Sequence, residues 1–169
     1  MNIELVLFFV FALAILLSAG LVIFSKNPIN SAMSLVASFF FLAGIYVLLW
    51  AHTIAALQVL VYAGAIMVLF LFVIMLLNLG EAELGSQRLT LSRIAGGLAA
   101  LGIFAALALA ISRAPELAGS MDAARMAGFG TLRTVGQELY TRWLFPFEAV
   151  SLLLLVSMVG AVVVSKSKI

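Results

Sequence analysis

The stretch LQVLVYAGAIMVLFLFVIMLLNLG, residues 57–80, contains no charged residue and is long enough to cross a lipid bilayer. Three residues near its start are unusual for a simple membrane anchor: the amide of Gln58, the phenol of Tyr62 and the glycine at position 64. Glycine destabilises a helix by about 1 kcal/mol relative to alanine, and buried polar groups need hydrogen-bond partners. The stretch therefore predicts a transmembrane helix whose first half does more than span lipid.

The whole chain has the composition of an integral membrane protein. Of its 169 residues, 66% are hydrophobic and 9% are charged, whereas soluble domains have about 25% charged residues. The mean hydropathy is +1.29. Nine basic and seven acidic side chains are too few to cover a water-facing surface, and no basic run suggests nucleic-acid binding. Residues 3–24 lack a preceding basic region, so we expect a retained helix rather than a signal peptide.

The apolar segments predict an all-α, polytopic membrane protein consisting of one domain, residues 1–169. Five transmembrane helices are expected, at about residues 3–24, 29–50, 54–78, 94–112 and 144–165. The joint between the second and third is so short that these two helices must be antiparallel. Residues 113–143 carry charges of both signs and are expected to form an outer-side loop with room for a short surface helix.

The distribution of basic residues predicts the orientation, because lysine and arginine in short loops favour the cytoplasmic side. One side of the predicted topology holds Lys26, Arg88, Arg93, Lys166 and Lys168. The other side holds four arginines in one longer loop that also contains acidic residues: Arg113, Arg125, Arg133 and Arg142. This bias places the N-terminus outside and the C-terminus inside.

The polar residues of the third helix allow two interpretations. Gln58 and Tyr62 are four residues apart, so a regular helix places them on one face. They either make hydrogen bonds between helices, worth roughly 0.6–2 kcal/mol each, or organise water along a proton path. Gly64 either permits a close helix crossing or allows the helix to switch between regular and π-bulged turns.

Glu148 is the only carboxylate clearly inside a predicted span. It follows Pro146, which suits a first helical turn, and an acid there complements the helix dipole. Because intramembrane acids are costly and commonly functional, proton handling is the alternative role. The chain has no cysteine and one histidine, so we predict no catalytic, cofactor-binding or metal-binding residue in it. It is expected to work against partners.

Three segments of the sequence resemble one protein family. VLVYAGAIMVLFLFVIMLLNL, residues 59–79, resembles the third transmembrane helix of the NADH-quinone oxidoreductase subunit J family, whose mitochondrial counterpart is NADH dehydrogenase subunit six. NPINSAMSLVASFFFLAGIYVLL, residues 27–49, resembles the second helix of that family, and GQELYTRWLFPFEAVSLLLLVSMVGAVVV, residues 136–164, its last helix. The resemblance covers nearly the whole chain, and the Tyr-Ala-Gly-Ala-Ile block is its most specific part.

The resemblance implies a membrane-arm subunit of respiratory complex I, which couples quinone reduction to proton pumping through a flexible third helix. Its partners would be membrane lipid and the other membrane subunits, especially subunits K, H, A and N, of which the first is small and the second holds the quinone site. The family carries no cofactor, so NADH, FMN, iron–sulfur clusters and quinone would belong to partner subunits. The implied location is the bacterial inner (plasma) membrane, with residues 80–93 on the cytoplasmic side.

In this family the third helix is thought to gain or lose a π-bulge near its Tyr-Ala-Gly block, which opens or closes a water path. Mapped onto this sequence, that role falls to Tyr62, Gly64 and Met67. Some relatives carry glutamate where this chain has Gln58. Because an amide does not release a proton near neutral pH, Gln58 can orient water but cannot be a titrating relay.

Two alternatives remain open at the level of sequence. The chain could be the homologous subunit of a ferredoxin- or F420-linked dehydrogenase, a membrane-bound hydrogenase or a cation antiporter complex. A stand-alone small transporter is the less favoured alternative, since it would need its own ion-binding carboxylate at the bilayer midplane, and the sequence places none there.

Overall fold

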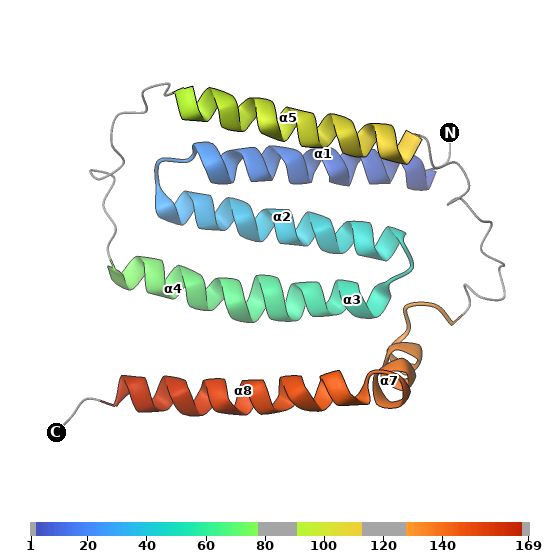
Figure 1. Cartoon of the computed structure of the whole chain (residues 1–169), viewed down its shortest axis with the longest axis vertical. Helices are drawn as coiled ribbons and strands as arrows, with labels where there is room; N and C mark the ends of the chain where they lie inside the picture. Colours follow the sequence, from blue (N-terminus) through green and yellow to red (C-terminus); the bar gives the residue numbers. More distant parts are fainter. Residues whose placement is uncertain (1–2, 78–90, 113–127, 167–169) are drawn as a thin grey trace.

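The computed structural model describes residues 3–77, 91–112 and 128–166, and all regular elements within these ranges are helices (Figure 1). The predicted all-α class is thus confirmed. In chain order the elements are α1 (Ile3–Phe24), α2 (Pro28–Leu48), α3 (His52–Leu57), η1 (Gln58–Ile66), α4 (Met67–Leu77), α5 (Leu91–Ser112), α7 (Leu132–Thr141) and α8 (Leu144–Ser165).

Four helical segments of the described residues are long and apolar enough to cross a membrane, which makes this a multi-pass membrane protein. They are α1, α2, the continuous segment His52–Leu77 that joins α3, η1 and α4 (the third span), and α8. The apolar part of α5 is shorter, Gly96–Ser112. The surface helix expected within residues 113–143 corresponds to α7, while residues 113–127 lie outside the described part of the chain.

The turn between α1 and α2 is closed by short polar side chains. The Asn27 side chain accepts a hydrogen bond from the Ile29 N–H at 2.9 Å, and Pro28 occupies the first helical position, where its missing N–H costs nothing. The Ser31 hydroxyl donates to the carbonyl oxygen of Val22 at 2.6 Å, which ties the start of α2 to the end of α1. The sequence Asn-Pro therefore sets the antiparallel hairpin.

The α1–α2 contact is close because a ring lies on a glycine. A Cβ atom added at Gly44 would lie 3.0 Å from two ring atoms of Phe11. The absence of a side chain at Gly44 lets the aromatic ring of α1 rest on the backbone of α2. Small residues permit this kind of approach in membranes, where packing rather than hydrophobicity drives helix association.

The end of α2 departs from the sequence prediction, which extended the helix to Trp50. Trp50 has a φ of 62°, its N–H donates to the Val47 carbonyl at 3.0 Å, and the Ala51 N–H donates to the Tyr46 carbonyl at 2.9 Å. These two bonds form a Schellman motif, in which glycine is the usual left-handed residue. The motif ends the helix at Leu48 and turns the chain back, so that the third span packs antiparallel along α2.

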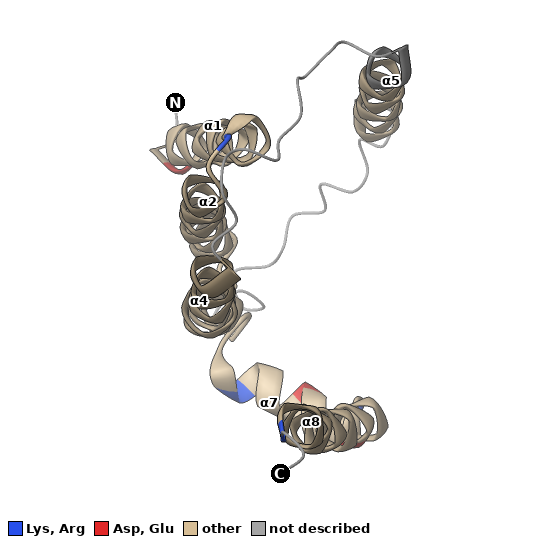
Figure 2. Cartoon of the chain, turned by 90° about the vertical axis from the view of Figure 1, so that its left-hand side faces the viewer, with Lys and Arg blue, Asp and Glu red and all other residues tan. Residues whose placement is uncertain are grey.

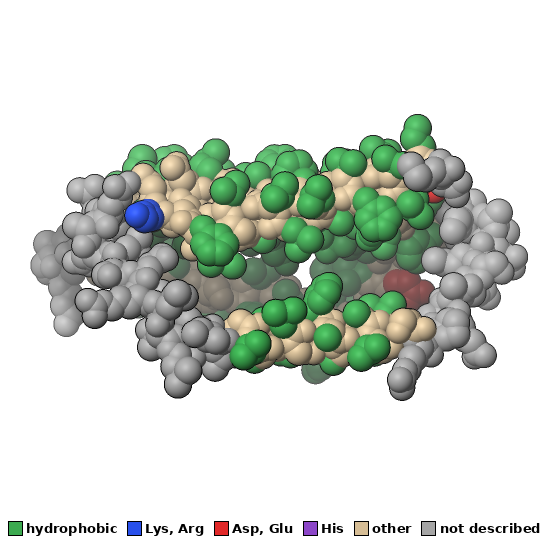
Figure 3. Space-filling view, turned by 90° about the horizontal axis from the view of Figure 1, so that it is seen from above, with side chains coloured by type: hydrophobic (Ala, Val, Ile, Leu, Met, Phe, Trp, Pro, Cys, Tyr) green, Lys and Arg blue, Asp and Glu red, His purple; other side chains and the backbone are tan. Residues whose placement is uncertain are grey.

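The helices do not form a closed bundle. α1, α2 and the third span stand side by side in one row with α2 in the middle, while α5 lies apart and α8 is joined to the row through α7 (Figure 2). Hydrophobic side chains cover the helices along their length, and the charged side chains of the described residues lie towards the ends (Figure 3). Exposed apolar faces of this extent mark surfaces that contact lipid or other helices.

We predict that Gly44→Val separates α1 from α2, because the new side chain occupies the place of the Phe11 ring. Overpacking of this kind costs about 1–3 kcal/mol, so the thermal unfolding temperature of the detergent-solubilised protein should fall. Gly20→Val is the matched control, since a Cβ at Gly20 in α1 meets no atom within 4 Å. Equal unfolding temperatures for the two variants would contradict this account of the contact.

Candidate functional site

The third span contains a π-helix, η1, over the nine residues Gln58–Ile66. At its end the Met67 N–H donates to the carbonyl oxygen of Tyr62, five residues earlier, where an α-helix would bond to the fourth. π-Helices make up well under 1% of residues in proteins and occur frequently at functional sites. The segment includes three of the residues singled out from sequence: Gln58, Tyr62 and Gly64.

The π-helix changes which residues of the third span are buried. Gln58, Ala63 and Met67 are only 6%, 5% and 4% exposed, so the buried positions are separated by five residues and then by four. In a regular helix the residues following Gln58 on that face would be Tyr62 and Ile66, yet these are 49% and 50% exposed. Gln58 is therefore buried while Tyr62, four residues later, is half exposed, and Ala63 takes the buried position instead.

Tyr62 lies at the edge of the contact between the third span and α2. Its ring meets that of Phe39 edge to face, with centroids 5.9 Å apart and an angle of 69° between the planes. Such pairs contribute about 0.5–1.5 kcal/mol beyond the buried area. The phenol is thus held beside α2 without being enclosed by it. Phe39 was not identified from the sequence, where it is one of three consecutive phenylalanines.

Gly64 is placed where a side chain would press on its own helix. An added Cβ atom would lie 3.2 Å from the carbonyl oxygen of Val59, five residues earlier, and no atom of a neighbouring helix in the described structure lies within 4 Å. This separation is tighter than nine in ten real Cβ contacts. Of the two roles considered for Gly64, the structure fits accommodation of the π-helix rather than a close helix crossing.

Met67 and Glu148 are placed differently relative to the other candidates. Met67 begins α4 directly after η1 and is buried. Glu148 lies on the exposed surface of α8, a helix whose main contact in the described structure is with α7. The structure therefore brings Gln58, Tyr62, Gly64 and Met67 together on one segment and leaves Glu148 apart.

The described residues contain no group of three or more His, Cys, Asp and Glu side chains that could hold a metal ion. η1 contains a buried amide, a phenol and a backbone whose π-helical hydrogen bonds have an α-helical alternative. Helices with π-type and α-type bonding both satisfy their backbone groups internally, as lipid requires. The chemistry available in the third span is therefore hydrogen bonding to water, together with a change of helix register.

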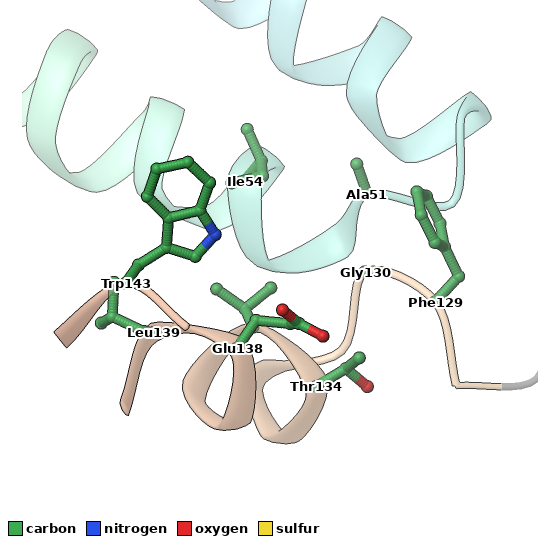
Figure 4. A pocket seen from close by; sticks show the side chains of 9 residues that line it. Ala51, Ile54, Phe129, Gly130, Thr134, Glu138, Leu139 and Trp143 are labelled. Atoms are coloured by element: carbon green, nitrogen blue, oxygen red, sulfur yellow. The ribbon is translucent and has the colours of Figure 1, made fainter. Parts of the chain in front are cut away.

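A contact between segments far apart in the sequence holds the beginning of the third span. The carbonyl oxygen of Gly130 accepts hydrogen bonds from the Thr53 N–H at 3.0 Å and from the Thr53 hydroxyl at 2.8 Å. Beside it lies a recess of about 350 Å³ between α3 and α7, whose lining includes Ile54, Leu139 and Trp143 (Figure 4). Nothing in the sequence marked this contact, because 77 residues separate its members.

Comparison with known proteins identifies the family. The family described as NADH-ubiquinone/plastoquinone oxidoreductase chain 6 matches residues 18–164, which is most of the chain. The chain belongs to this family. Subunit J of the NADH-quinone oxidoreductase of Rhodobacter capsulatus is 36% identical over 161 residues, which cover 94% of this chain and 79% of that relative.

Two further relatives are similar to most of this chain. NADH-quinone oxidoreductase subunit 10 of Thermus thermophilus is 43% identical over 148 residues, covering 88% of this chain and 81% of the relative. NAD(P)H-quinone oxidoreductase chain 6 of Leptolyngbya boryana is 36% identical over 165 residues, covering 98% and 81%. The matched range, residues 18–164, contains the residues of η1 as well as Thr53 and Gly130.

We predict that Gly64→Ala shifts the third span towards a regular helix. The added Cβ presses on the Val59 carbonyl in the π-helix, and alanine favours an α-helix over glycine by about 1 kcal/mol. A structure of the variant should show Ile66 buried in the place of Met67. Gly20→Ala, where the Cβ has free space, should leave the π-helix unchanged, and an intact π-helix in Gly64→Ala would contradict the role given to this glycine.

Proposed function

We propose that this chain is a membrane-arm subunit of a proton-translocating NADH:quinone oxidoreductase and that η1 is its moving part. The observation that carries the proposal is the π-helix over Gln58–Ile66 in a chain of this family. The names of the relatives support the oxidoreductase assignment, since they are subunits of NADH- or NAD(P)H-quinone oxidoreductases. The chain contributes to that reaction as a part of the complex, through its helices.

The coupling step is a change of register in the third span. The π-helical segment takes in one residue more than the same turns of an α-helix would. If η1 becomes a regular helix, the residues beyond it therefore shift by one position around the axis, a rotation of about 100°, the angle per residue in an α-helix. Tyr62 and Ile66 then replace Ala63 and Met67 against α2. The bulk and the hydroxyl of Tyr62 enter a space that alanine occupies in the present structure.

This exchange of side chains changes whether water can enter between the third span and α2, because polar groups hold water in a membrane and apolar groups exclude it. Gln58 is buried at the start of η1 and supplies an amide that orients water. Met67 is an apolar side chain at the other end of η1. The π-helical and regular states therefore present different linings to a water path. Protons on this path are exchanged with carboxyl groups of neighbouring subunits or with Glu148.

The proposed placement within the complex is supported by the surfaces left exposed. α5 and α8 stand apart from the row of three helices, and in our proposal helices of other subunits, those of K, H, A and N among them, fill the intervening space. In this arrangement α5 is the fifth transmembrane helix of a single membrane domain, residues 1–169. NADH, FMN, iron–sulfur clusters and quinone are bound by the partner subunits.

The proposed topology has the N-terminus outside and the C-terminus inside the bacterial inner membrane, with residues 80–93 on the cytoplasmic side. Its support is that Lys26, in the α1–α2 turn, and Lys166, after α8, lie at the same end of the helices (Figure 1). Arg133 and Arg142 lie at the other end, on and beside α7. The remaining basic residues of the topology prediction, apart from Arg93 in α5, fall outside the described residues: Arg88, Arg113, Arg125 and Lys168.

The proposal is tested with Gly64→Val. The Cβ of the β-branched side chain crowds the Val59 carbonyl in the π-helix, at 3.2 Å, so we expect the regular helix to be favoured and the cycle to slow. We expect normal assembly but quinone reduction with proton pumping slowed roughly tenfold, as a barrier raised by about 1.4 kcal/mol produces. Assays in membrane vesicles measure both activities, with Gly20→Val as the control. Normal coupled turnover in the assembled variant would refute the moving-helix mechanism.

The water-organising role of Gln58 has its own test. Gln58→Leu keeps a side chain of similar size but removes the amide, so we expect fewer protons pumped per electron with little loss of assembly. The proton-to-electron ratio in sealed vesicles measures this. An unchanged ratio would leave Gln58 with a packing role only.

Isolation from native membranes tests the complex itself. Purification through a tag on this chain, followed by identification of the electron-input subunits, should recover an NADH-oxidising module. Recovery of a hydrogenase module, a ferredoxin- or F420-dependent module, or an antiporter assembly would replace the proposed electron donor. A chain that purifies alone and conducts ions in liposomes would instead support a stand-alone transporter.

A further inference from the structure

The first turn of α3 is capped by a residue from a distant segment. The first four N–H groups of any helix lack partners within the helix, and Ala51, at the N-cap of α3, has no polar side chain to supply one. The Gly130 carbonyl takes this place, since it accepts both the N–H and the hydroxyl of Thr53. The start of the third span is thereby hydrogen-bonded to the loop that leads into α7.

The capping contact is a tight fit of backbone against backbone. Gly130 has a φ of +69°, and a Cβ atom there would overlap the Trp50 carbonyl oxygen and the Ala51 Cα atom. Trp50 is itself left-handed, with a φ of 62°. Two left-handed residues thus meet, and a side chain at position 130 would push the loop away from the corner between α2 and α3.

The segment that supplies Gly130 is in turn fixed to α7. Thr131 is the N-cap residue of α7, and its side-chain oxygen accepts a hydrogen bond from the Thr134 N–H. The hydroxyls of Thr131 and Thr134 are 2.9 Å apart, and the Thr134 hydroxyl donates to the Gly128 carbonyl. Residues 128–134 therefore form one hydrogen-bonded unit, and α3 is attached to α7 by directional bonds.

The other half of the third span has no comparable attachment in the described structure. α4 packs on α2 through apolar side chains, and between them lies a recess of about 300 Å³ lined by Ile29, Met33, Val68, Leu71, Phe72 and Met75. Apolar contacts are non-directional, and the recess leaves room for side chains to rearrange. A rotation of α4 therefore meets less resistance than a rotation of α3.

We infer that Thr53 and Gly130 are positioning residues that hold α3 on α7, so that a change of register in η1 rotates α4 and leaves α3 in place. This inference rests on the proposed function of η1 as a moving part. A helix that changes register in its middle must turn one end relative to the other. The Thr53–Gly130 contact, the anchor of α3, determines which end turns. The motion therefore occurs in the part of the span beyond Met67.

Two covalent cross-links in the assembled complex test the inference. Because the chain contains no cysteine, only engineered pairs in it react with a short bifunctional maleimide. The pair Ile54→Cys with Val135→Cys joins α3 to α7 across their recess, and the pair Met33→Cys with Phe72→Cys joins α2 to α4. Quinone reduction and proton pumping are measured in vesicles before and after cross-linking.

We expect the α2–α4 cross-link to slow coupled turnover roughly tenfold, while the α3–α7 cross-link leaves it within about twofold. Strong inhibition by the α3–α7 cross-link would overturn the anchor, because it would show that α3 must move. A harmless α2–α4 cross-link would instead overturn the moving third span itself, whatever the other pair does. Failure of the inference and failure of the proposed function are therefore distinguishable.

The Thr53 hydroxyl is tested by a second pair of variants. Thr53→Val keeps the branched shape but removes the donor, whereas Thr53→Ser retains it. Hydrogen exchange of the amides at the start of α3 should become about fivefold faster in Thr53→Val, as expected for one lost hydrogen bond, and the number of protons pumped per electron should fall. Thr53→Ser should match the natural protein in both measurements. Unchanged exchange in Thr53→Val, or faster exchange with an unchanged proton-to-electron ratio, would overturn the positioning role.

Discussion

The constraint on which the structure depends is that backbone N–H and C=O groups inside lipid must be satisfied within the protein. It explains why the described elements are helices and why connections fall at their ends. It also limits how such a chain can change shape. A π-helix exchanges bonds to the fourth residue for bonds to the fifth, so η1 can convert to a regular helix without leaving backbone groups unpaired. The third span therefore contains a segment whose π-helical and α-helical bonding patterns are both compatible with lipid.

The chain has little interior of its own. Among the described residues, the buried apolar side chains are mostly alanines on α2 and the third span, with Met67 as the only large one. Also among the described residues, long apolar faces of α1, α5 and α8 remain exposed. Contacts with neighbouring subunits must then supply much of the stability, as binding to the folded state generally does. The exposure of α5 and α8 is thus a property of a component rather than a defect of packing.

Much of the fold could be predicted from the sequence because apolar length is a strong signal in membranes. The bounds of α1 and α8 are those expected, and the short joint between the second and third helices indicated their antiparallel arrangement. The end of α2 was misplaced because nothing local indicates that Trp50 adopts a left-handed conformation. The π-helical segment was singled out through residues that are costly in lipid. Its geometry was missed where a repeat of 3.6 residues was assumed, and the Thr53–Gly130 contact was missed because pairings between distant segments leave no periodic signal.

Trp50 also indicates how deep in the membrane the residues of the third span lie. Tryptophan prefers the boundary between hydrocarbon and water, and here its ring packs edge to face on His52 at the start of the third span, with centroids 5.9 Å apart. Counted from His52, its first residue, at 1.5 Å per residue, the third span reaches Tyr62 after about 15 Å, close to the middle of a hydrocarbon layer about 30 Å thick. On the proposed path, a proton that reaches Tyr62 would have crossed roughly half of the membrane's electric field, which is about half of the 2.3 kcal/mol that 100 mV imposes on a unit charge. The π-helix lies near the middle of the membrane, so about half of the membrane potential falls on each side of it.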